Sequence, residues 1–388
     1  MKKRIFSLVL ALAMVFGICA TAGAADSGVL RFDENGEFKI MHICDCQDDY
    51  PANPDMIKFL DTVIKDYQPD LVILGGDNTV ADNNMENGIK ELVSIFVENE
   101  TYFTLVFGNH DHQQDLTDDE QLVMYQKYGG KYCLAYDPHP ELTGTATHAL
   151  PILGSKSLKA ELMLYMFDSN EYVSVNGAEE YDCVNPDQIE WYKSVSKAAE
   201  IANGGEVVPA LAFQHIIVGE VYDALFHETS VDMGELSRSF NGKIYSFLPR
   251  TENIESGFLF EFPCPGYYNH GQFDAMVERG DVMGVFSGHD HTNDFVTELD
   301  GIKIVNTGGA THGGYSTDFN RGVRMITVNE NNPGTFETEM VTTGDLAISN
   351  SDFASAVGIS KLGATIVIAF GDFLEAMSKF TGIFSRLF

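Results

Sequence analysis

The segment VMGVFSGHDH, at residues 282–291, contains the pattern that organises the whole chain. Its first part, residues 282–286, is a short apolar run bounded by turn residues, which is typical of a buried strand. Gly288 follows, and His289 and His291 stand close behind it with one residue between them. A buried strand that ends in a glycine turn and polar side chains is typical of a layered α/β protein, in which strand ends present the functional groups.

The same pattern occurs four more times, each time after a short apolar run. The polar groups are Asp45-Cys46-Gln47, Gly76-Asp77-Asn78, Gly108-Asn109-His110-Asp111 and Gln214-His215. Because the carboxyl ends of parallel strands lie at one edge of a sheet, these groups are expected to meet in a single cluster. The glycines permit the tight turns and close backbone approach that such a cluster requires.

Helical patterns alternate with the apolar runs along the chain. We expect strands at residues 38–44, 71–74, 102–107, 163–167, 210–213, 282–286, 302–305 and 323–328, and helices at 55–67, 89–97, 117–128, 186–202 and 272–279. This alternation predicts an α/β layered fold. Residues 219–260 are less regular, and we interpret them as an insertion over one face.

Composition and charge limit the class of protein. Of the 388 residues, 44% are hydrophobic and 21% are charged, as in ordinary globular proteins and unlike disordered chains. Asp and Glu (57) outnumber Lys and Arg (24), which gives a net charge of −33. Such a surface repels a phosphate backbone, so no nucleic acid is expected as a partner.

Both ends of the chain are predicted to lie outside the main domain. Residues 1–24 have a basic start, an apolar stretch and a small-residue cleavage site, which indicates a signal peptide and a secreted or cell-surface protein. The main domain is assigned to residues 25–343, and residues 344–388 to an amphipathic helical tail. Within the tail, residues 351–388 either pack on the body or a dimer mate, or contact a membrane surface.

The cysteines do not predict a disulfide framework. Outside the leader there are five, an odd and widely spaced set: Cys44, Cys46, Cys133, Cys183 and Cys264. We expect the side chains of Cys44 and Cys46 to be buried in the core, as small apolar residues are. A single disulfide between Cys133 and Cys183 is an alternative that the spacing leaves open.

The side chains of the strand-end cluster fit a centre of two metal ions. Asp, Asn and His donate through oxygen and imidazole nitrogen, which suits divalent or mixed-valence ions of Mn, Fe or Zn. Two ions about 3.5–4 Å apart share a bridging carboxylate, activate water and hold a phosphoryl oxygen. The cluster therefore predicts a centre of two metal ions.

Taken together, these motifs resemble the calcineurin-like metallophosphoesterase superfamily. The resemblance spans residues 38–330 and is carried by the ordered set Asp45-x-Gln47, Gly76-Asp77, Gly108-Asn109-His110-Asp111, His215 and Gly288-His289-x-His291. Residues 282–296 look most like the purple-acid-phosphatase-like branch that lacks the purple chromophore. The resemblance implies a four-layer sandwich of two packed mixed β-sheets flanked by helices.

The resemblance also implies a role for each residue of the set. One metal would be held by Asp45, Gln47, Asp77 and His291, and the other by Asp77, Asn109, His215 and His289, so that Asp77 bridges the two. His110 would contact the phosphate and act as general acid, and Asp111 would orient it.

Two positions depart from the pattern of the family. Gln47 stands where the first motif usually ends in His, and a neutral amide oxygen is a weaker donor than imidazole. Gln47 therefore either holds the first metal less tightly or acts only as a hydrogen bonder beside the ligands. Val80 stands three residues after Asp77, where the purple enzymes place Tyr, so no tyrosinate colour is expected.

The sequence favours an exported phosphohydrolase with a small phosphomonoester as substrate. In this hypothesis a metal-bound hydroxide attacks phosphorus and His110 gives a proton to the leaving group. One alternative is a phosphodiesterase acting on nucleotides or phospholipid head groups. The other is a catalytically silent surface-binding module that keeps its metals for structure. The sequence predicts neither the oligomeric state nor the identity of the metals.

Four residues near the motifs receive weaker predictions. Substrate contact is predicted for His312, in a glycine-rich loop, with loop packing as the alternative. It is also predicted for Arg321, whose guanidinium matches phosphate, with surface ion pairing as the alternative. Arg324 is expected to pair at the surface, and His112 to be a solvated loop residue.

Overall fold

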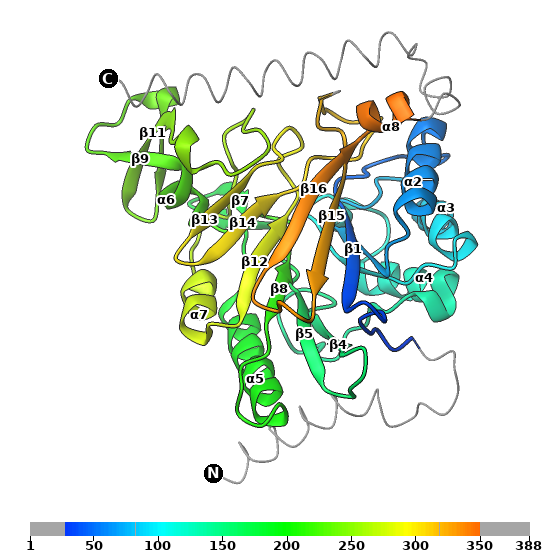
Figure 1. Ribbon diagram of the computed structural model, residues 1–388. Helices are drawn as coiled ribbons and strands as arrows, with labels where there is room; N and C mark the ends of the chain where they lie inside the picture. Colours follow the sequence, from blue (N-terminus) through cyan, green and yellow to red (C-terminus); the bar gives the residue numbers. More distant parts are fainter. Residues whose placement is uncertain (1–27, 82, 318, 350–388) are drawn as a thin grey trace.

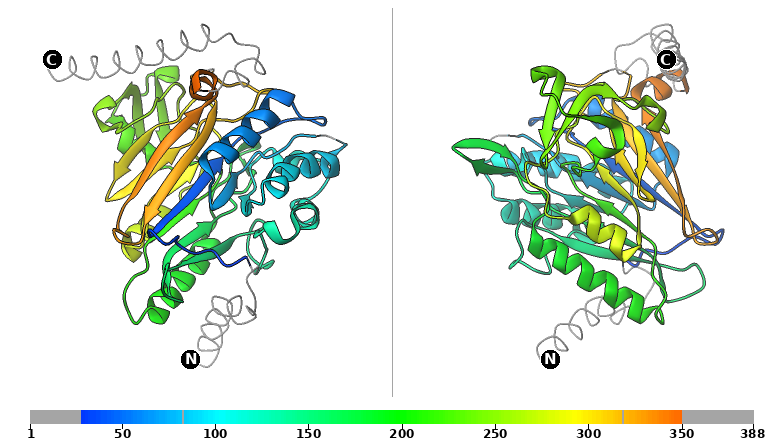
Figure 2. Two further views of the ribbon diagram at one scale, coloured as in Figure 1. Left: turned by 45° about the vertical axis from the view of Figure 1, so that its right-hand side comes forward. Right: turned by 90° about the vertical axis from the view of Figure 1, so that its left-hand side faces the viewer.

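Two β-sheets lie face to face at the centre of the molecule, and helices cover both outer faces (Figure 1, Figure 2). The computed structural model describes residues 28–349, apart from residues 82 and 318. The five-stranded sheet runs in the order β16-β15-β1-β2-β3 and comprises β1 (Glu37–Ile43), β2 (Leu71–Gly75), β3 (Phe103–Val106), β15 (Gly322–Asn329) and β16 (Phe336–Thr342). The six-stranded sheet runs in the order β13-β14-β12-β8-β5-β4 and comprises β4 (His148–Leu153), β5 (Ala160–Met166), β8 (Ala210–Phe213), β12 (Val282–Ser287), β13 (Val296–Leu299) and β14 (Ile302–Asn306).

Strand direction sets where the functional loops leave each sheet. β1, β2 and β3 are parallel, and β15 and β16 extend their sheet in antiparallel pairing. β5, β8, β12 and β14 are parallel, and β4 and β13 close the edges in antiparallel pairing. Both sheets are therefore mixed, and the loops after β1, β2, β3, β8 and β12 all leave from the carboxyl ends of parallel strands.

Apolar side chains fill the space between the sheets and beneath the helices. Between the sheets, Ile40 and Ile73 share one cluster with Leu211, and the rings of Phe213 and Phe286 stack there with centroids 5.1 Å apart. The five-stranded sheet is covered by α2 (Pro54–Tyr67), α3 (Met85–Glu98) and α4 (Asp118–Gly129), and the six-stranded sheet by α5 (Pro186–Ala202), α6 (Val221–Leu225) and α7 (Gln272–Arg279). The predicted four-layer sandwich is confirmed.

Most predicted elements form within a few residues of the expected bounds. Helices α5 and α7 and strand β8 match their predictions, and the capping box of Thr117 and Glu120 starts α4. The sequence does not predict β16, because polar residues alternate along it and only Val341 is fully buried. Residues 226–249 are more regular than expected and form a small sheet of β9 (Phe226–Thr229), β10 (Ser237–Phe240) and β11 (Lys243–Pro249).

The cysteines and the chain ends complete the account of the fold. Cys44 and Cys46 are buried as expected, but Cys133 and Cys183 are free, so the alternative of a disulfide between them is wrong. Helix α8 (Thr343–Ser349) follows β16. The predicted signal peptide and tail segment 351–388 lie outside the described residues. In the part of the chain that the structure describes, no helix combines the length and hydropathy needed to cross a bilayer.

Candidate metal centre

Five loops, each at the carboxyl end of a strand, bring the predicted ligands together. Asp45 and Gln47 follow β1, Asp77 follows β2, Asn109 follows β3, His215 follows β8, and His289 and His291 follow β12. The donor atoms of Asp77, His215 and His289 lie within 4.8 Å of one another, as do those of Asp45, Asp77 and His291. Asp77 belongs to both groups, which is the position of a carboxylate that bridges two ions.

Asp77 is the middle of the cluster and is only 1% exposed. Its Oδ1 accepts a hydrogen bond from the backbone N–H of His110 at 2.8 Å, and its Oδ2 lies 3.2 Å from His215 Nε2. Burial opposes ionisation, but the neighbouring His215 outweighs it and holds the pKa of Asp77 well below its ordinary value. Asp77 is therefore a carboxylate, the form that a metal ligand needs.

Asp45 joins the loop after β1 to the loop after β12. Its two carboxylate oxygens accept from the backbone N–H of His289 at 3.3 and 3.1 Å, and its Oδ1 lies 3.4 Å from His291 Nε2. A Cβ at Gly288 would lie 2.7 Å from Cys44 Cβ and 2.8 Å from Asp45 Oδ2. The glycine before the two histidines is thus required by the close approach of these loops.

Backbone carbonyls fix the orientation of two histidines. Nδ1 of His215 lies 2.9 Å from the carbonyl oxygen of Gly75, and Nδ1 of His291 lies 2.8 Å from that of Tyr315. Because a carbonyl can only accept, each Nδ1 carries a proton and donates it. Both Nε2 atoms consequently face the carboxylates, as they would toward a metal.

Two buried atoms of the centre have no hydrogen-bond partner. They are Asn109 Oδ1 and His215 Nε2, and both residues are fully buried. Buried polar atoms are normally satisfied, and an amide oxygen without a donor is an exception that a bound cation would explain. Cations would satisfy both atoms together with the carboxylates of Asp45 and Asp77. The residues present therefore fit the divalent ions that their donor types suggest.

The histidines respond to the carboxylates in different ways. Burial disfavours the charged ring, but Asp77 and Asp45 outweigh it and raise the pKa of His215 to about 10. Asp45 likewise outweighs burial and raises the pKa of His291 to about 9. Burial and the neighbouring His215 instead lower the pKa of His289 to about 3. At neutral pH the centre holds protons on His215 and His291 unless a cation takes their place.

The backbone at four candidate ligands adopts a conformation that non-glycine residues rarely occupy. Asp45, Gln47, Asp77 and His289 have φ values of 52°, 37°, 50° and 71°. Residues in this region persist where the surrounding structure fixes them, and they concentrate at functional sites. The strand-to-loop turns thus aim these side chains at one point.

Gln47 reaches the centre but presents its amide nitrogen. Its Nε2 donates to Asp77 Oδ2 at 2.6 Å. Next to a carboxylate, the Gln47 amide points its nitrogen, the donor, at Asp77. If a cation lay beside Asp77, the amide group would rotate by 180° and point its oxygen at the cation. Gln47 can therefore act in either of the two ways that the sequence leaves open.

His110 lies at the rim of the centre with part of its ring exposed. Its Nδ1 lies 2.8 Å from Gln113 Oε1. The predicted orientation of this ring by Asp111 is wrong, because the Asp111 carboxylate is used to join two loops. It accepts from the backbone N–H of Gly108 at 2.9 Å and from that of Asn78 at 2.9 Å. Gln113 therefore takes the place given to Asp111.

Both predicted substrate residues have side chains engaged by the loop after β14. Nδ1 of His312 lies 3.1 Å from the carbonyl oxygen of Ala310, and its ring centroid lies 6.4 Å from that of Phe59 on α2. Nε of Arg321 donates to the carbonyl oxygen of Thr311 at 2.8 Å. Substrate contact stays a prediction for both side chains.

A second cluster of His and Asp lies outside the centre. His112 Nδ1 contacts the carboxylate of Asp118, and its Nε2 lies 3.7 Å from Asp168 Oδ1. Only 11% of the His112 side chain is exposed, so the prediction of a solvated loop residue is wrong. The two carboxylates outweigh burial and raise the pKa of His112 to about 11.

Arg324 is also buried, contrary to the prediction that it pairs at the surface. Its guanidinium donates to two backbone carbonyls inside the fold.

Two tyrosines of one hairpin lie beside the centre and are missed by the sequence analysis. Tyr172 on β6 (Tyr172–Val175) accepts from Asn109 Nδ2 at 3.1 Å and from Gln113 Nε2 at 3.3 Å. Tyr181 on β7 (Ala178–Tyr181) meets the ring of His289 edge-on, with centroids 4.4 Å apart. This hairpin contains no motif, and only folding brings it to the ligands.

The chain matches known proteins over most of its length. The family model of calcineurin-like phosphoesterases matches residues 38–293. "Probable inactive purple acid phosphatase 14" of Arabidopsis thaliana is 28% identical over 363 residues, which cover 84% of each chain. "Probable inactive purple acid phosphatase 29" of the same plant is 26% identical and covers 84% of this chain and 85% of the plant protein. A crystal structure of a dimetal phosphatase from Danio rerio superposes with a TM-score of 0.45 and 13% identity, covering 78% of this chain and 98% of that one.

Proposed function

Because this chain belongs to the calcineurin-like phosphoesterase family, we propose that it is an exported phosphomonoesterase that works with two metal ions. One observation carries the proposal. The donor atoms of Asp77, His215 and His289 lie within 4.8 Å of one another, as do those of Asp45, Asp77 and His291, and a buried group of acceptors of this kind is costly unless cations complete it.

The seven residues divide into two ligand sets that share one carboxylate. Asp45, Gln47, Asp77 and His291 would hold the first ion, and Asp77, Asn109, His215 and His289 the second. Oxygen and imidazole donors in this mixture suit Mn, Fe or Zn, in divalent or mixed-valence form. When bound, the two ions would supply a nucleophilic water and neutralise the charge of the phosphoryl group.

His110 supplies the proton that the leaving group needs. In hydrolysis the bond between phosphorus and the ester oxygen breaks, a water oxygen bonds to phosphorus, and the leaving alkoxide takes up a proton. His110 stands at the exposed rim, and the contact of its Nδ1 with Gln113 Oε1 turns Nε2 outward as the donor. The backbone N–H of His110 donates to Asp77 Oδ1, and this hydrogen bond fixes the position of His110 relative to the candidate ligands.

A second candidate function is a surface-binding module whose metals are structural. The identity of Gln47 favours it, because a neutral amide oxygen is a weaker metal donor than imidazole. A weakly held first ion would leave one firmly bound ion and no hydrolysis. The word "inactive" in the names of the two plant relatives also supports this candidate.

The substrate, the location and the tail are further parts of the proposal. A small phosphorylated molecule is the proposed substrate, with His312 and Arg321 as contacts at the loop after β14. The net charge of −33 supports the exclusion of nucleic acids. Residues 1–24 support export. A membrane role of residues 351–388 is tested by deleting them and measuring sedimentation with liposomes; unchanged sedimentation would exclude it.

The function is tested by removing and restoring metal. Purified protein is treated with a chelator, dialysed, and assayed with Mn²⁺, Fe²⁺ or Zn²⁺ on a panel of phosphomonoesters and phosphodiesters. We expect no hydrolysis without metal, and restored hydrolysis of monoesters with at least one ion. Hydrolysis of diesters alone would replace the monoesterase by the diesterase. Absence of hydrolysis with a single bound ion per chain would support the silent module.

A further inference from the structure

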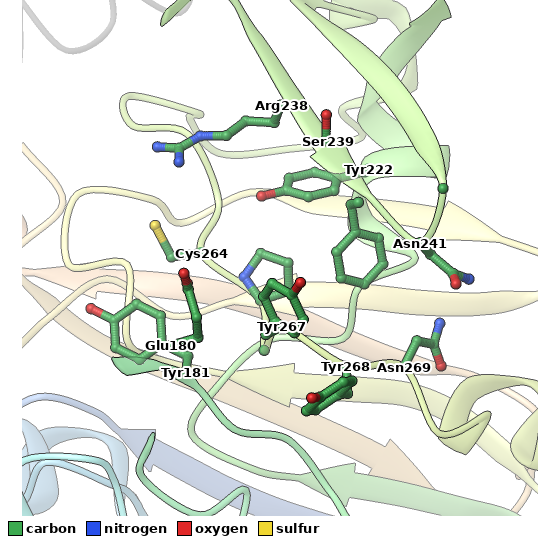
Figure 3. Close-up of a pocket in the computed structure, with 14 residues that line it drawn as sticks. Glu180, Tyr181, Tyr222, Arg238, Ser239, Asn241, Cys264, Tyr267, Tyr268 and Asn269 are labelled. Carbon is green, nitrogen blue, oxygen red and sulfur yellow. The ribbon is translucent and has the colours of Figure 1, made fainter. Parts of the chain in front are cut away.

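A hollow of about 580 Å³ opens between the hairpin β6–β7 and the small sheet (Figure 3). One wall is the end of the hairpin β6–β7, at Glu180 and Tyr181. The opposite walls come from the small sheet, at residues 238–242, and from the loop at residues 264–269. Its size is within the range of about 300–1,000 Å³ that is usual for small-molecule sites. The hollow is therefore large enough for an organic group of the size of a nucleoside.

Two contacts connect this hollow to the metal ligands. Tyr181, which lines it, meets the ring of His289 edge-on at 4.4 Å between centroids. Cys264, which also lines it, donates its backbone N–H to Asp290 Oδ1 at 3.2 Å, and Asp290 stands between His289 and His291. A group in the hollow is thus separated from the centre by the thickness of one side chain.

The lining of the hollow is aromatic with a polar rim. The rings are those of Tyr181, Tyr222, Phe240, Tyr267 and Tyr268, and the labelled tyrosines surround the cavity in Figure 3. Tyr267 and Tyr268 are 47% and 42% exposed, although large rings are usually covered. Arg238, Asn241 and Asn269 add hydrogen-bond donors at the rim. Flat rings with polar groups beside them match a planar aromatic ligand.

We propose that this hollow binds the aromatic leaving group of the phosphate ester. The inference rests on the proposed hydrolytic function, and it adds the class of substrate. The ester phosphate would lie at the ligands, and its aromatic alcohol would extend past Tyr181 and lie between Phe240 and Tyr268. Offset and edge-to-face ring contacts stabilise such a group, whereas a short alkyl group gains little from them. The alcohol is either a simple phenol or a nucleoside, since both present a planar ring.

The first test compares esters that differ only in the leaving group. The kcat/KM values of phenyl phosphate, adenosine 5′-monophosphate and ethyl phosphate are measured for the wild type and for Tyr268→Ala. We expect the variant to lose about tenfold on the aromatic esters and to keep its rate on ethyl phosphate. Tyr268→Phe keeps the ring and should behave as the wild type. A loss for phenyl phosphate alone assigns the site to a phenol, and a loss for the nucleotide alone assigns it to a nucleoside.

The controls separate the hollow from the fold and from catalysis. Leu158, which is 80% exposed and does not line the hollow, is replaced by Ala and should leave all three rates unchanged. Equal losses on all three esters in Tyr268→Ala would overturn the proposal. The melting temperature of each variant shows whether it is folded. Phe240→Ala removes a second ring from the same hollow and repeats the test at another position.

The second test does not depend on hydrolysis. Binding of adenosine and of phenol to chelator-treated protein is followed by nuclear magnetic resonance, for the wild type and Tyr268→Ala. We expect weak binding that the variant loses. If no ester is hydrolysed but this difference is present, the hydrolytic function fails and the aromatic site stands. If esters are hydrolysed but neither probe distinguishes the two proteins, the aromatic site fails and the hydrolytic function stands.

Discussion

Two clusters of His and Asp in this molecule contain the same residue types and behave differently. In the candidate metal centre, Nδ1 of His215 and of His291 is occupied by a backbone carbonyl, and Nε2 faces carboxylates. In the second cluster, both ring nitrogens of His112 face carboxylates, those of Asp118 and Asp168. The second cluster therefore provides its own cation, the imidazolium of His112.

The difference lies in how the histidine rings are oriented in each cluster. Asp168 is further satisfied by the backbone N–H groups of Asn170 at 2.8 Å and Thr145 at 2.7 Å, so a protonated His112 completes the ion pair. Both clusters also contain buried atoms without a hydrogen-bond partner: Asn109 Oδ1 in the candidate metal centre, and Asp118 Oδ1 and His112 Nε2 in the second cluster. Proximity of His and Asp is thus insufficient to indicate a metal. The informative feature is the orientation of the rings: in the candidate metal centre a backbone carbonyl occupies Nδ1 and leaves Nε2 for a cation, whereas both ring nitrogens of His112 face carboxylates.

The largest expected effect comes from removing the shared carboxylate. Asp77→Asn keeps the shape of the side chain but removes the charge that both ions would share. We expect loss of bound metal and a decrease in kcat/KM of about 10⁴-fold or more, because the ions supply both the nucleophile and charge stabilisation. The measurement is hydrolysis of phenyl phosphate. Asp118→Asn, the matched change in the second cluster, should keep its metal, and similar losses in both variants would contradict the comparison.

Removing the general acid should lower the rate without removing metal. In His110→Ala we expect a decrease of about 10²–10⁴-fold on ethyl phosphate, whose alkoxide needs a proton. The decrease should be much smaller on 4-nitrophenyl phosphate, whose phenolate leaves without one. Metal content should equal that of the wild type. An equal decrease on both esters would exclude proton donation by His110. Gln113→Ala should produce a weaker effect of the same kind.

The pH dependence of metal binding follows from the raised pKa values of two ligands. His215 and His291 have pKa values of about 10 and 9, so each is protonated at pH 7 in the absence of metal. A cation must displace these protons, and its affinity should increase by about tenfold per pH unit for each proton displaced, until the pH exceeds both pKa values. Calorimetry in buffers of different ionisation enthalpy measures the protons released. Release of no protons at pH 7 would contradict this account.

A substitution in the second cluster should lower the free energy of unfolding and leave the metal content unchanged. His112→Gln removes the imidazolium between two carboxylates, and we expect a loss of about 3 kcal/mol in the free energy of unfolding. The folded-state pKa of His112 is raised to about 11. Its contribution is therefore complete below the ordinary histidine pKa of about 6.5 and is lost as the pH rises toward 11. Denaturant unfolding of both proteins between pH 6 and pH 10.5 measures this. A constant difference would show that the ion pair is not the cause.

The sequence predicts the fold and the ligands because both depend on local pattern. Apolar runs followed at once by Gly and a polar group fix strand, turn and ligand within about ten residues. β16 escapes prediction because one of its faces is polar, and its pairing with β15 depends on residues far away in the chain.

The partners of the ligands cannot be predicted in this way. Tyr172 reaches Asn109 from a hairpin 63 residues away, and Tyr315 reaches His291 from a loop after another strand. His112 has the appearance of a loop residue in the sequence, because Asp168 lies 56 positions farther along the chain. Asp111 shows the opposite error, since its place beside His110 suggests a role that its buried hydrogen bonds exclude.

The central claim is that the strand-end cluster binds two cations and the second cluster binds none. Its most direct test is the metal content per chain, measured by inductively coupled plasma mass spectrometry after equilibration with Mn²⁺ and gel filtration. The account predicts two ions in the wild type, two in His112→Gln, and fewer than one in Asp77→Asn. Two ions in Asp77→Asn, or the loss of an ion in His112→Gln, would contradict it.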